Sequence, residues 1–211
     1  MHIPDGILSP AVLGTTAVIT AGVLAKSVRF SKGELEQRAV PVMGVMASFI
    51  FAAQMINFPL LGAAASGHLI GGALATFLFG FWPATLIMTT VIAIQALVFQ
   101  DGGITALGTN LLNMAIIAPA AAAILFHLLR KFRLPRSVVV FVGAWGSVVL
   151  TALAGAVELA LSGVVSLELA SKALLFWHFF IGLGEGLITA LVVPFALRSS
   201  FMIRRKEMTL E

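Results

Sequence analysis

Stretches of mostly apolar residues, separated by short polar segments, form the strongest pattern along the chain. They cover residues 10–28, 41–56, 69–81, 84–99, 107–129, 138–161 and 173–197. A helix needs about 20 apolar residues to cross a hydrocarbon core of about 30 Å, and most of these stretches approach that length. The third stretch, 69–81, would rise only about 20 Å as a helix. Together with 84–99, it is compatible with a tight hairpin, a re-entrant pair or one broken span. We therefore predict an all-α integral membrane protein with one transmembrane domain, residues 1–211.

Composition supports a lipid environment. Hydrophobic residues make up 60% of the chain and charged residues only 10%, and the mean hydropathy is +1.07. The isoelectric point near 10.1 could indicate a nucleic-acid partner, but the basic residues form short clusters between apolar stretches, as in membrane proteins. We therefore expect the lipid bilayer, and no nucleic acid, as a partner. The chain has no cysteine, so a metal site would have to use nitrogen or oxygen ligands.

The basic residues also predict a topology. Twelve of the 13 lysines and arginines follow the first, fifth and seventh stretches: Lys26, Arg29, Lys32, Arg38, Arg130, Lys131, Arg133, Arg136, Arg198, Arg204, Arg205 and Lys206. If residues 69–99 enter the membrane and return, all twelve lie on one side and only Lys172 lies on the other. The positive-inside rule then favours seven membrane segments in the cell membrane. Residues 1–9 would lie outside, and residues 198–211 would form a cytoplasmic tail.

In this topology most polar residues fall on the outer side. They are His2, Asp5, Asn57, Ser66, His68, Gln100 and Asp101 near segment ends, and Gln95, Asn110, Asn113, Glu158 and His178 in outer halves of spans. Polar groups in membranes usually face a bundle interior or a cavity. Their distribution predicts a capture pocket that is open to the outside and closed beneath. Hydrogen bonding between helices is the alternative role for each Asn or Gln.

The first residues form a possible metal chelate. The terminal amine of Met1, the deprotonated amide nitrogen of His2 and His2 Nδ1 can surround one ion in a plane and leave the fourth corner free. Nitrogen-rich square-planar sites suit Ni(II) and Cu(II). Pro4 stiffens the segment, and Asp5-Gly6 is typical of a turn. The alternative interpretation is an ordinary chain start followed by an isolated histidine and a turn.

Three other histidines need an interpretation. His68 lies at the outer entrance of the third stretch among glycines, and it is either a metal ligand or an interfacial cap. His178 and Glu185 are seven residues apart on one helix face, which suggests a proton relay, a second metal site or hydrogen bonding between helices. We favour hydrogen bonding, because Glu185 should lie too deep to reach a chelate at the surface. His127 is expected at the interface beside Arg130.

Enzymatic motifs are absent from the sequence. It contains no His-Glu-x-x-His, no Gly-x-Ser-x-Gly and no Walker A motif, so we expect no catalytic residues and no ATP hydrolysis by this chain. Uphill transport would then require an ion gradient or another subunit.

Four stretches resemble one known family, the substrate-specific S components of cobalt and nickel energy-coupling-factor (ECF) transporters (CbiM/NikM family). They are residues 1–6, residues 66–72, residues 99–108 with Asn110 and Asn113-Met114, and residues 185–190. The first two are highly specific, and the resemblance covers nearly the whole chain. The opening and the Ser-Gly-His-Leu form look more like the nickel-type branch.

The resemblance implies a seven-transmembrane-helix bundle with an extra amino-terminal helix ahead of a six-helix core. It implies that the amino terminus plugs into the bundle, with Met1, His2 and His68 as ligands of Ni²⁺ or Co²⁺. The metal is the transported substrate, and no organic cofactor is implied. Implied partners are a transmembrane T component, two cytoplasmic ATPases and a small accessory membrane subunit, which we expect as a separate chain.

Two other classes of function remain open at this point. A self-sufficient secondary transporter would use His178 and Glu185 as a proton path. A membrane enzyme with a metal-activated water would need an open coordination position, which a plane of four nitrogens lacks.

Overall fold

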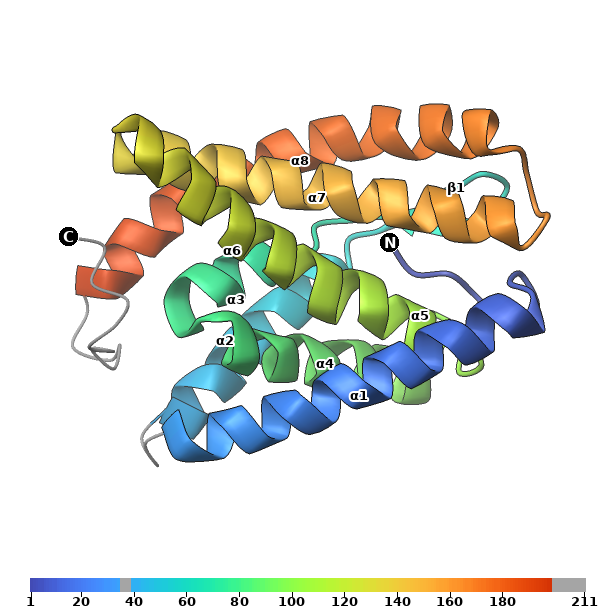
Figure 1. The fold of residues 1–211 in the computed structure, drawn as a ribbon, viewed down its shortest axis with the longest axis horizontal. Coiled ribbons are helices and arrows are strands. Elements are labelled where there is room, and N and C mark those ends of the chain that lie inside the picture. Colours follow the sequence, from blue (N-terminus) through green and yellow to red (C-terminus); the bar gives the residue numbers. More distant parts are fainter. Residues whose placement is uncertain (35–38, 199–211) are drawn as a thin grey trace.

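The computed structural model describes residues 1–34 and 39–198 of the chain, and these residues are almost entirely helical (Figure 1). The α-helices are α1 (Pro10–Glu34), α2 (Ala39–Gln54), α3 (Gly72–Phe79), α4 (Phe81–Val98), α5 (Leu107–Leu111), α6 (Ala118–Leu129), α7 (Arg136–Leu161) and α8 (Leu167–Arg198). A π-helical segment, Leu112–Ile117, joins α5 to α6, and a 3-10 turn, Arg130–Phe132, follows α6. The predicted helical class is therefore confirmed.

Five of the described helical segments are long and apolar enough to cross a membrane: 10–31, 81–98, 107–132, 136–161 and 167–198. Helix α2 is apolar but has only 16 residues. Each of the apolar stretches expected from the sequence contains a helix. One feature was not expected: strands β1 (Phe58–Leu60) and β2 (Ala65–Gly67) form a short antiparallel hairpin between α2 and α3. The turn between them contains Gly62 at φ 63°, a conformation that glycine adopts without strain.

Helices α3 and α4 explain the short third stretch. All eight residues of α3 are buried, and α3 packs against α4, α6 and α8. Gly80, at φ 80°, lies between α3 and α4, which pack against each other. Helix α3 rises only about 12 Å, too little to cross the core of a bilayer. Residues 69–99 therefore form a hairpin in which a short buried helix precedes a long one.

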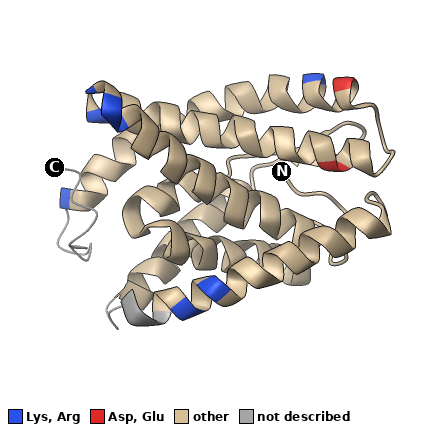
Figure 2. Cartoon of the chain, viewed as in Figure 1, with Lys and Arg blue, Asp and Glu red and all other residues tan. Residues whose placement is uncertain are grey.

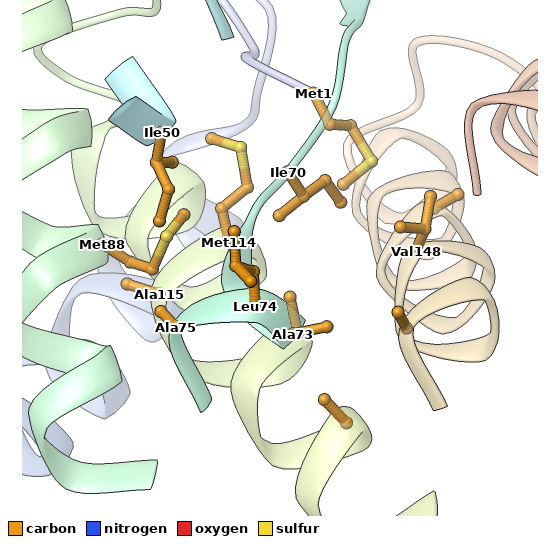
Figure 3. Close-up of a cluster of buried hydrophobic side chains, with 14 of the residues drawn as sticks. Met1, Ile50, Ile70, Ala73, Leu74, Ala75, Met88, Met114, Ala115 and Val148 are labelled. Carbon is orange, nitrogen blue, oxygen red and sulfur yellow. The ribbon is translucent and has the colours of Figure 1, made fainter. Parts of the chain in front are cut away.

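The remaining helices enclose this hairpin. Helices α7 and α8 pack together along much of their length, and α6 packs against α7. Helix α1 crosses α4 and α5, where a Cβ atom on Gly108 would lie only 2.7 Å from the Ala17 Cα atom. The central cluster of buried side chains includes Met1, Ile70, Met88, Met114 and Val148 (Figure 3). The first residue of the chain is thus part of the core.

The described lysines and arginines gather mainly at one end of the molecule (Figure 2). This end holds the carboxyl-terminal part of α1, the connection between α6 and α7 and the end of α8. Lys172, near the beginning of α8, is the exception predicted from the sequence. Arg38, Arg204, Arg205 and Lys206 lie outside the described ranges. The clustering at one end is the arrangement on which the predicted topology depends.

Candidate metal centre

The amino-terminal segment, residues 1–5, enters the helix bundle and is called the plug. Met1, His2 and Ile3 are 0%, 3% and 1% exposed. The Asn110 side chain holds both polar groups of the Ile3 backbone: the Ile3 N–H donates to Asn110 Oδ1 and Asn110 Nδ2 donates to the Ile3 carbonyl, each at 2.9 Å. Because Asn110 is itself fully buried, this pair fixes the depth of the plug in the bundle.

The loop after α4 cradles the plug. The Gly103 N–H donates to the Ile3 carbonyl at 3.0 Å. A Cβ atom on Gly103 would overlap Asp5 and Pro4, and one on Gly102 would lie 3.1 Å from His2 Cδ2. The glycines at these two positions therefore let the loop backbone approach the plug closely.

Asp5 closes the outer end of this cradle. Its carboxylate accepts hydrogen bonds from the Thr105 N–H at 2.7 Å, the Thr105 hydroxyl at 2.5 Å and the Ile104 N–H at 3.1 Å. The hydrogen bond from the Thr105 side chain is the main reason why the pKa of Asp5 lies below its usual value. The Asp5 side chain, at the predicted Asp5-Gly6 turn, thus ties the amino-terminal segment to the loop after α4.

The Met1 side chain is seated between α7 and α8. Its terminal methyl group faces Gly155, where a Cβ atom would lie 3.0 Å away, and a Cβ at that position would also contact Leu174. Figure 3 shows Met1 projecting into the buried cluster near Ile70. The side chain therefore anchors the residue that carries the terminal amine.

The His2 ring is oriented by Gln95, a fully buried residue of α4. His2 Nε2 lies 3.1 Å from Gln95 Oε1. Since an amide oxygen only accepts hydrogen bonds, Nε2 carries the proton and Nδ1 keeps a free lone pair. His2 Nδ1 is buried without a hydrogen-bond partner, and the nearest acid is Asp101, whose Oδ1 lies 3.4 Å away. This is the tautomer that the chelate predicted from the sequence requires.

The His68 ring is oriented in the complementary way. Its Nδ1 donates to the Leu69 carbonyl at 2.7 Å, so that Nε2 carries the free lone pair, and Nε2 is also buried without a partner. The His2 and His68 rings stack with their centroids 4.6 Å apart and their planes at 24°. Two stacked imidazoles that are far apart in sequence thus each bury one ring nitrogen that has no hydrogen-bond partner.

The backbone of His2 is paired with β2. The His2 N–H donates to Ser66 Oγ at 2.8 Å, and the Ser66 N–H donates to the His2 carbonyl at 3.1 Å. The hairpin β1–β2 therefore carries both Ser66 and His68 to the plug. A metal that binds the His2 amide nitrogen would replace the proton now donated to Ser66.

Burial keeps both imidazoles neutral. It lowers the pKa of His2 to about 4, against a smaller opposing effect of the Gln95 hydrogen bond. Burial also lowers the pKa of His68, which the Leu69 hydrogen bond and the charge of Asp101 oppose. Desolvation raises the pKa of Asp101, opposed by His68 and by the Asn57 hydrogen bond. Neutral imidazole is the form that binds metals.

No group of three or more His, Asp or Glu side chains within residues 1–34 and 39–198 is arranged to hold a metal ion. Beside the imidazoles of His2 and His68, the nitrogens of the Met1 amine and the His2 amide are available as donors in the same segment. Such a nitrogen-rich set suits Ni²⁺ and Cu²⁺ more than Mg²⁺ or Ca²⁺.

The other residues singled out from the sequence have different surroundings. His178 Nδ1 bonds the Leu174 carbonyl at 2.8 Å within α8. Asn113, in the π-helical segment, donates to Glu158 at 2.6 Å, which is a bond between helices. Both Glu185 carboxyl oxygens accept backbone N–H groups, those of Ile70 and Gly71, so Glu185 bonds the segment that follows His68. Gln95, Asp101 and Asn110, which the sequence predicted on the same side as His2, contact the amino-terminal segment in the structure. Their role in holding the plug had no local signal.

Comparison with known proteins gives consistent matches. The family model described as CbiM, cobalt uptake substrate-specific transmembrane region, matches residues 2–202. A protein of Archaeoglobus fulgidus that carries the name of a fused nickel transport protein, NikMN, is 38% identical over 197 residues. That match covers 92% of this chain and 65% of the relative. The cobalt transport protein CbiM 1 of Pelobacter propionicus is 33% identical over 210 residues, which cover 94% of this chain and 91% of the relative.

A solved structure shares the fold. The crystal structure of a truncated transition metal transporter superposes with a TM-score of 0.88 at 33% identity, covering 93% of this chain and 98% of that chain. The resemblance inferred from residues 1–6, 66–72, 99–108 and 185–190 is thus confirmed. The chain belongs to the CbiM family, the cobalt uptake substrate-specific transmembrane region.

Proposed function

We propose that this chain is the substrate-specific membrane subunit of a nickel or cobalt importer, and that it captures the metal from outside the cell. The names of its relatives refer to nickel transport and to cobalt transport. The single observation that carries the proposal is that His2 Nδ1 and His68 Nε2 are both buried without a hydrogen-bond partner, on rings whose centroids lie 4.6 Å apart.

The proposed ligands are the Met1 amine, the His2 amide nitrogen, His2 Nδ1 and His68 Nε2. Coordination by an amide nitrogen requires removal of its proton, which Ni(II) promotes better than Co(II). Four nitrogens in a plane give a low-spin Ni(II) centre. Affinity alone would favour copper by the Irving–Williams order, so metal availability contributes to the choice of substrate.

Orientation and partners are also part of the proposal. The cluster of basic residues at one end of the molecule supports a cytoplasmic location of that end, by the positive-inside rule. The plug then faces outward. Energy would come from a T component and two ATPases, with a small accessory membrane subunit. Nickel uptake by cells that express this chain alone, driven by a proton gradient, would instead indicate a secondary transporter.

The decisive experiment blocks the terminal amine. We expect a chain with two extra residues before Met1 to lose nickel binding, because the amine becomes an amide and the plug no longer ends at its pocket. The control is the same extension followed by a protease site that restores Met1 as the first residue. Unchanged nickel affinity in the uncleaved protein would refute the chelate.

An absorption spectrum of the nickel-loaded protein checks the ligands. We expect the yellow colour of diamagnetic, square-planar nickel, lost in His2→Ala and in His68→Ala. His178→Ala and His127→Ala should keep it. A pale, paramagnetic octahedral spectrum would contradict the proposed ligand set.

A further inference from the structure

The backbone of Ile70, two residues after His68, is held from two sides. Its N–H donates to Glu185 Oε2 at 2.6 Å, and the next N–H, of Gly71, donates to Glu185 Oε1 at 2.9 Å. Its carbonyl accepts a hydrogen bond from Gln54 Nε2 at 2.5 Å. Gln54 and Glu185 are 0% and 3% exposed, so these bonds are not shared with water.

The two side chains come from helices that otherwise pack elsewhere. Gln54 is the last residue of α2, which packs mainly along α4, and Glu185 lies in α8, which packs mainly along α7. A small cleft of about 50 Å³ lies between α2 and α8 at this level. Its walls include Phe49 and Ile50 on α2 and Ile188 on α8, and its roof is the segment 69–71.

The segment 69–71 packs closely against α2. Ile70 is fully buried, and a Cβ atom on Gly71 would lie 2.8 Å from the Ile50 side chain. Gly71 itself has φ 81° and precedes the first residue of α3. The Glu185 carboxyl group therefore also faces the amino-terminal end of α3, where the free N–H groups favour a carboxylate.

The His68 ring is linked to the same segment, because its Nδ1 donates to the Leu69 carbonyl. A short path thus runs from the His68 ring through the Leu69 and Ile70 peptides to Gln54 on one side and Glu185 on the other. Each step of this path is a hydrogen bond, and the side chains of His68, Gln54 and Glu185 are buried, so a change in the position of the ring would alter the contacts of both helices.

We propose that Gln54 and Glu185 form a clasp on the Ile70 peptide that positions His68 and links the metal centre to the spacing between α2 and α8. This inference rests on the proposed role of His68 as a ligand. A bound metal holds the His68 ring in one position and thereby also the 69–71 segment. The distance between α2 and α8 is then restricted to a narrow range. Without metal, the His68 ring and the 69–71 segment are free to move, and the two helices sample a wider range of distances across the cleft.

The clasp can be tested without metal. Glu185→Gln replaces one acceptor oxygen by a donor group, so one of the two backbone N–H groups loses its partner. We expect amide hydrogen exchange at Ile70 and Gly71 to rise about tenfold or more in the metal-free variant. Thr189→Val is the matched control: Thr189 lies one turn further along α8, lines the same cleft and has no hydrogen-bond partner for its hydroxyl. Equal exchange rates in the two variants would overturn the clasp, whatever the metal site proves to be.

The positioning role predicts a specific nickel titration. Glu185→Gln and, independently, Gln54→Met should need about tenfold more nickel for saturation, in the range seen for residues that support metal ligands. At saturation both should show the parent absorption band, because the ligands are intact, whereas His68→Ala should show none. Parent affinity in both clasp variants would overturn the positioning role. A parent protein that binds no nickel would instead count against the proposed function.

The link to helix spacing is read from two spin labels. Since the chain has no cysteine, Val45→Cys on α2 and Leu191→Cys on α8 give a unique pair, and both positions are well exposed, at 71% and 67%. We expect nickel to narrow the distance distribution in the parent and in Thr189→Val, but not in Glu185→Gln. An unchanged distribution in the parent, or equal narrowing in Glu185→Gln, would overturn the link.

Discussion

Gln95→Leu tests the inference that the His2 tautomer is set by its surroundings. In the parent, Gln95 Oε1 accepts the His2 Nε2 proton and leaves Nδ1 for the metal. Leucine is similar in size to glutamine but has no hydrogen-bond acceptor. His2 and Gln95 are both almost completely buried, so water cannot replace the lost acceptor. In the nickel-bound variant the Nε2–H group would remain buried and unpaired, because coordination through Nδ1 prevents the ring from turning. In the metal-free variant the ring can turn, so the cost falls mainly on the bound state.

The size of the effect follows from this asymmetry. Leaving a buried donor unpaired costs about 1–3 kcal/mol. Since about 1.4 kcal/mol corresponds to a tenfold change in an equilibrium constant, the affinity for nickel should fall about 5- to 140-fold. This range overlaps the loss of about 10- to 100-fold that is typical when a partner of a metal-bound histidine is removed.

The assay is a nickel titration against a competing chelator in detergent, with Gln95→Glu as the control. Glutamate keeps an acceptor oxygen at the same place, and its negative charge also favours a bound cation, so this variant should bind at least as tightly as the parent. The reasoning would be refuted if Gln95→Leu bound within about twofold of the parent, or if both variants weakened equally.

Three further predictions concern the plug, its pH dependence and the topology. Gly103→Val should abolish nickel binding in the same titration, because the valine side chain would occupy the space of Asp5 and Pro4. The control is Gly14→Ala, where a Cβ meets no atom within 4 Å, and this variant should bind nickel like the parent. Because burial lowers the pKa of His2 from 6.5 to about 4, the unfolded chain takes up this proton first as the pH falls. Stability of the metal-free protein should therefore decrease between these two pKa values, by about 3 kcal/mol for this residue, and His2→Gln should lack this part of the slope in thermal unfolding. An impermeant thiol reagent should label Lys172→Cys but not Lys131→Cys in intact cells, and the reverse result would contradict the outward orientation of the plug.

Much of this protein could be inferred from local sequence. Apolar stretches of suitable length identify membrane helices because every backbone polar group in a bilayer core must be satisfied within the helix itself. The chelating potential of Met1 and His2 is equally local, since it depends only on adjacent atoms. The same holds for the basic clusters, whose positions along the chain already indicated that residues 69–99 reverse direction.

The supports of the site depended on the tertiary structure. The residues that support the site are distant in sequence from the residues they bond. His2 bonds Ser66 and Gln95, 64 and 93 positions away, and Ile70, in the segment after His68, bonds Glu185, 115 positions away. A buried polar side chain must find some partner, but its sequence does not say which. Glu185 illustrates this, because nothing near it in the sequence indicates that its carboxylate bonds the backbone of Ile70 and Gly71. The hairpin β1–β2 and the short helix α3 place the segment after His68 against the Glu185 carboxylate. Sequence thus determined which groups are able to bind a metal, and the packing of distant segments decided which nitrogen of each histidine is left free to do so.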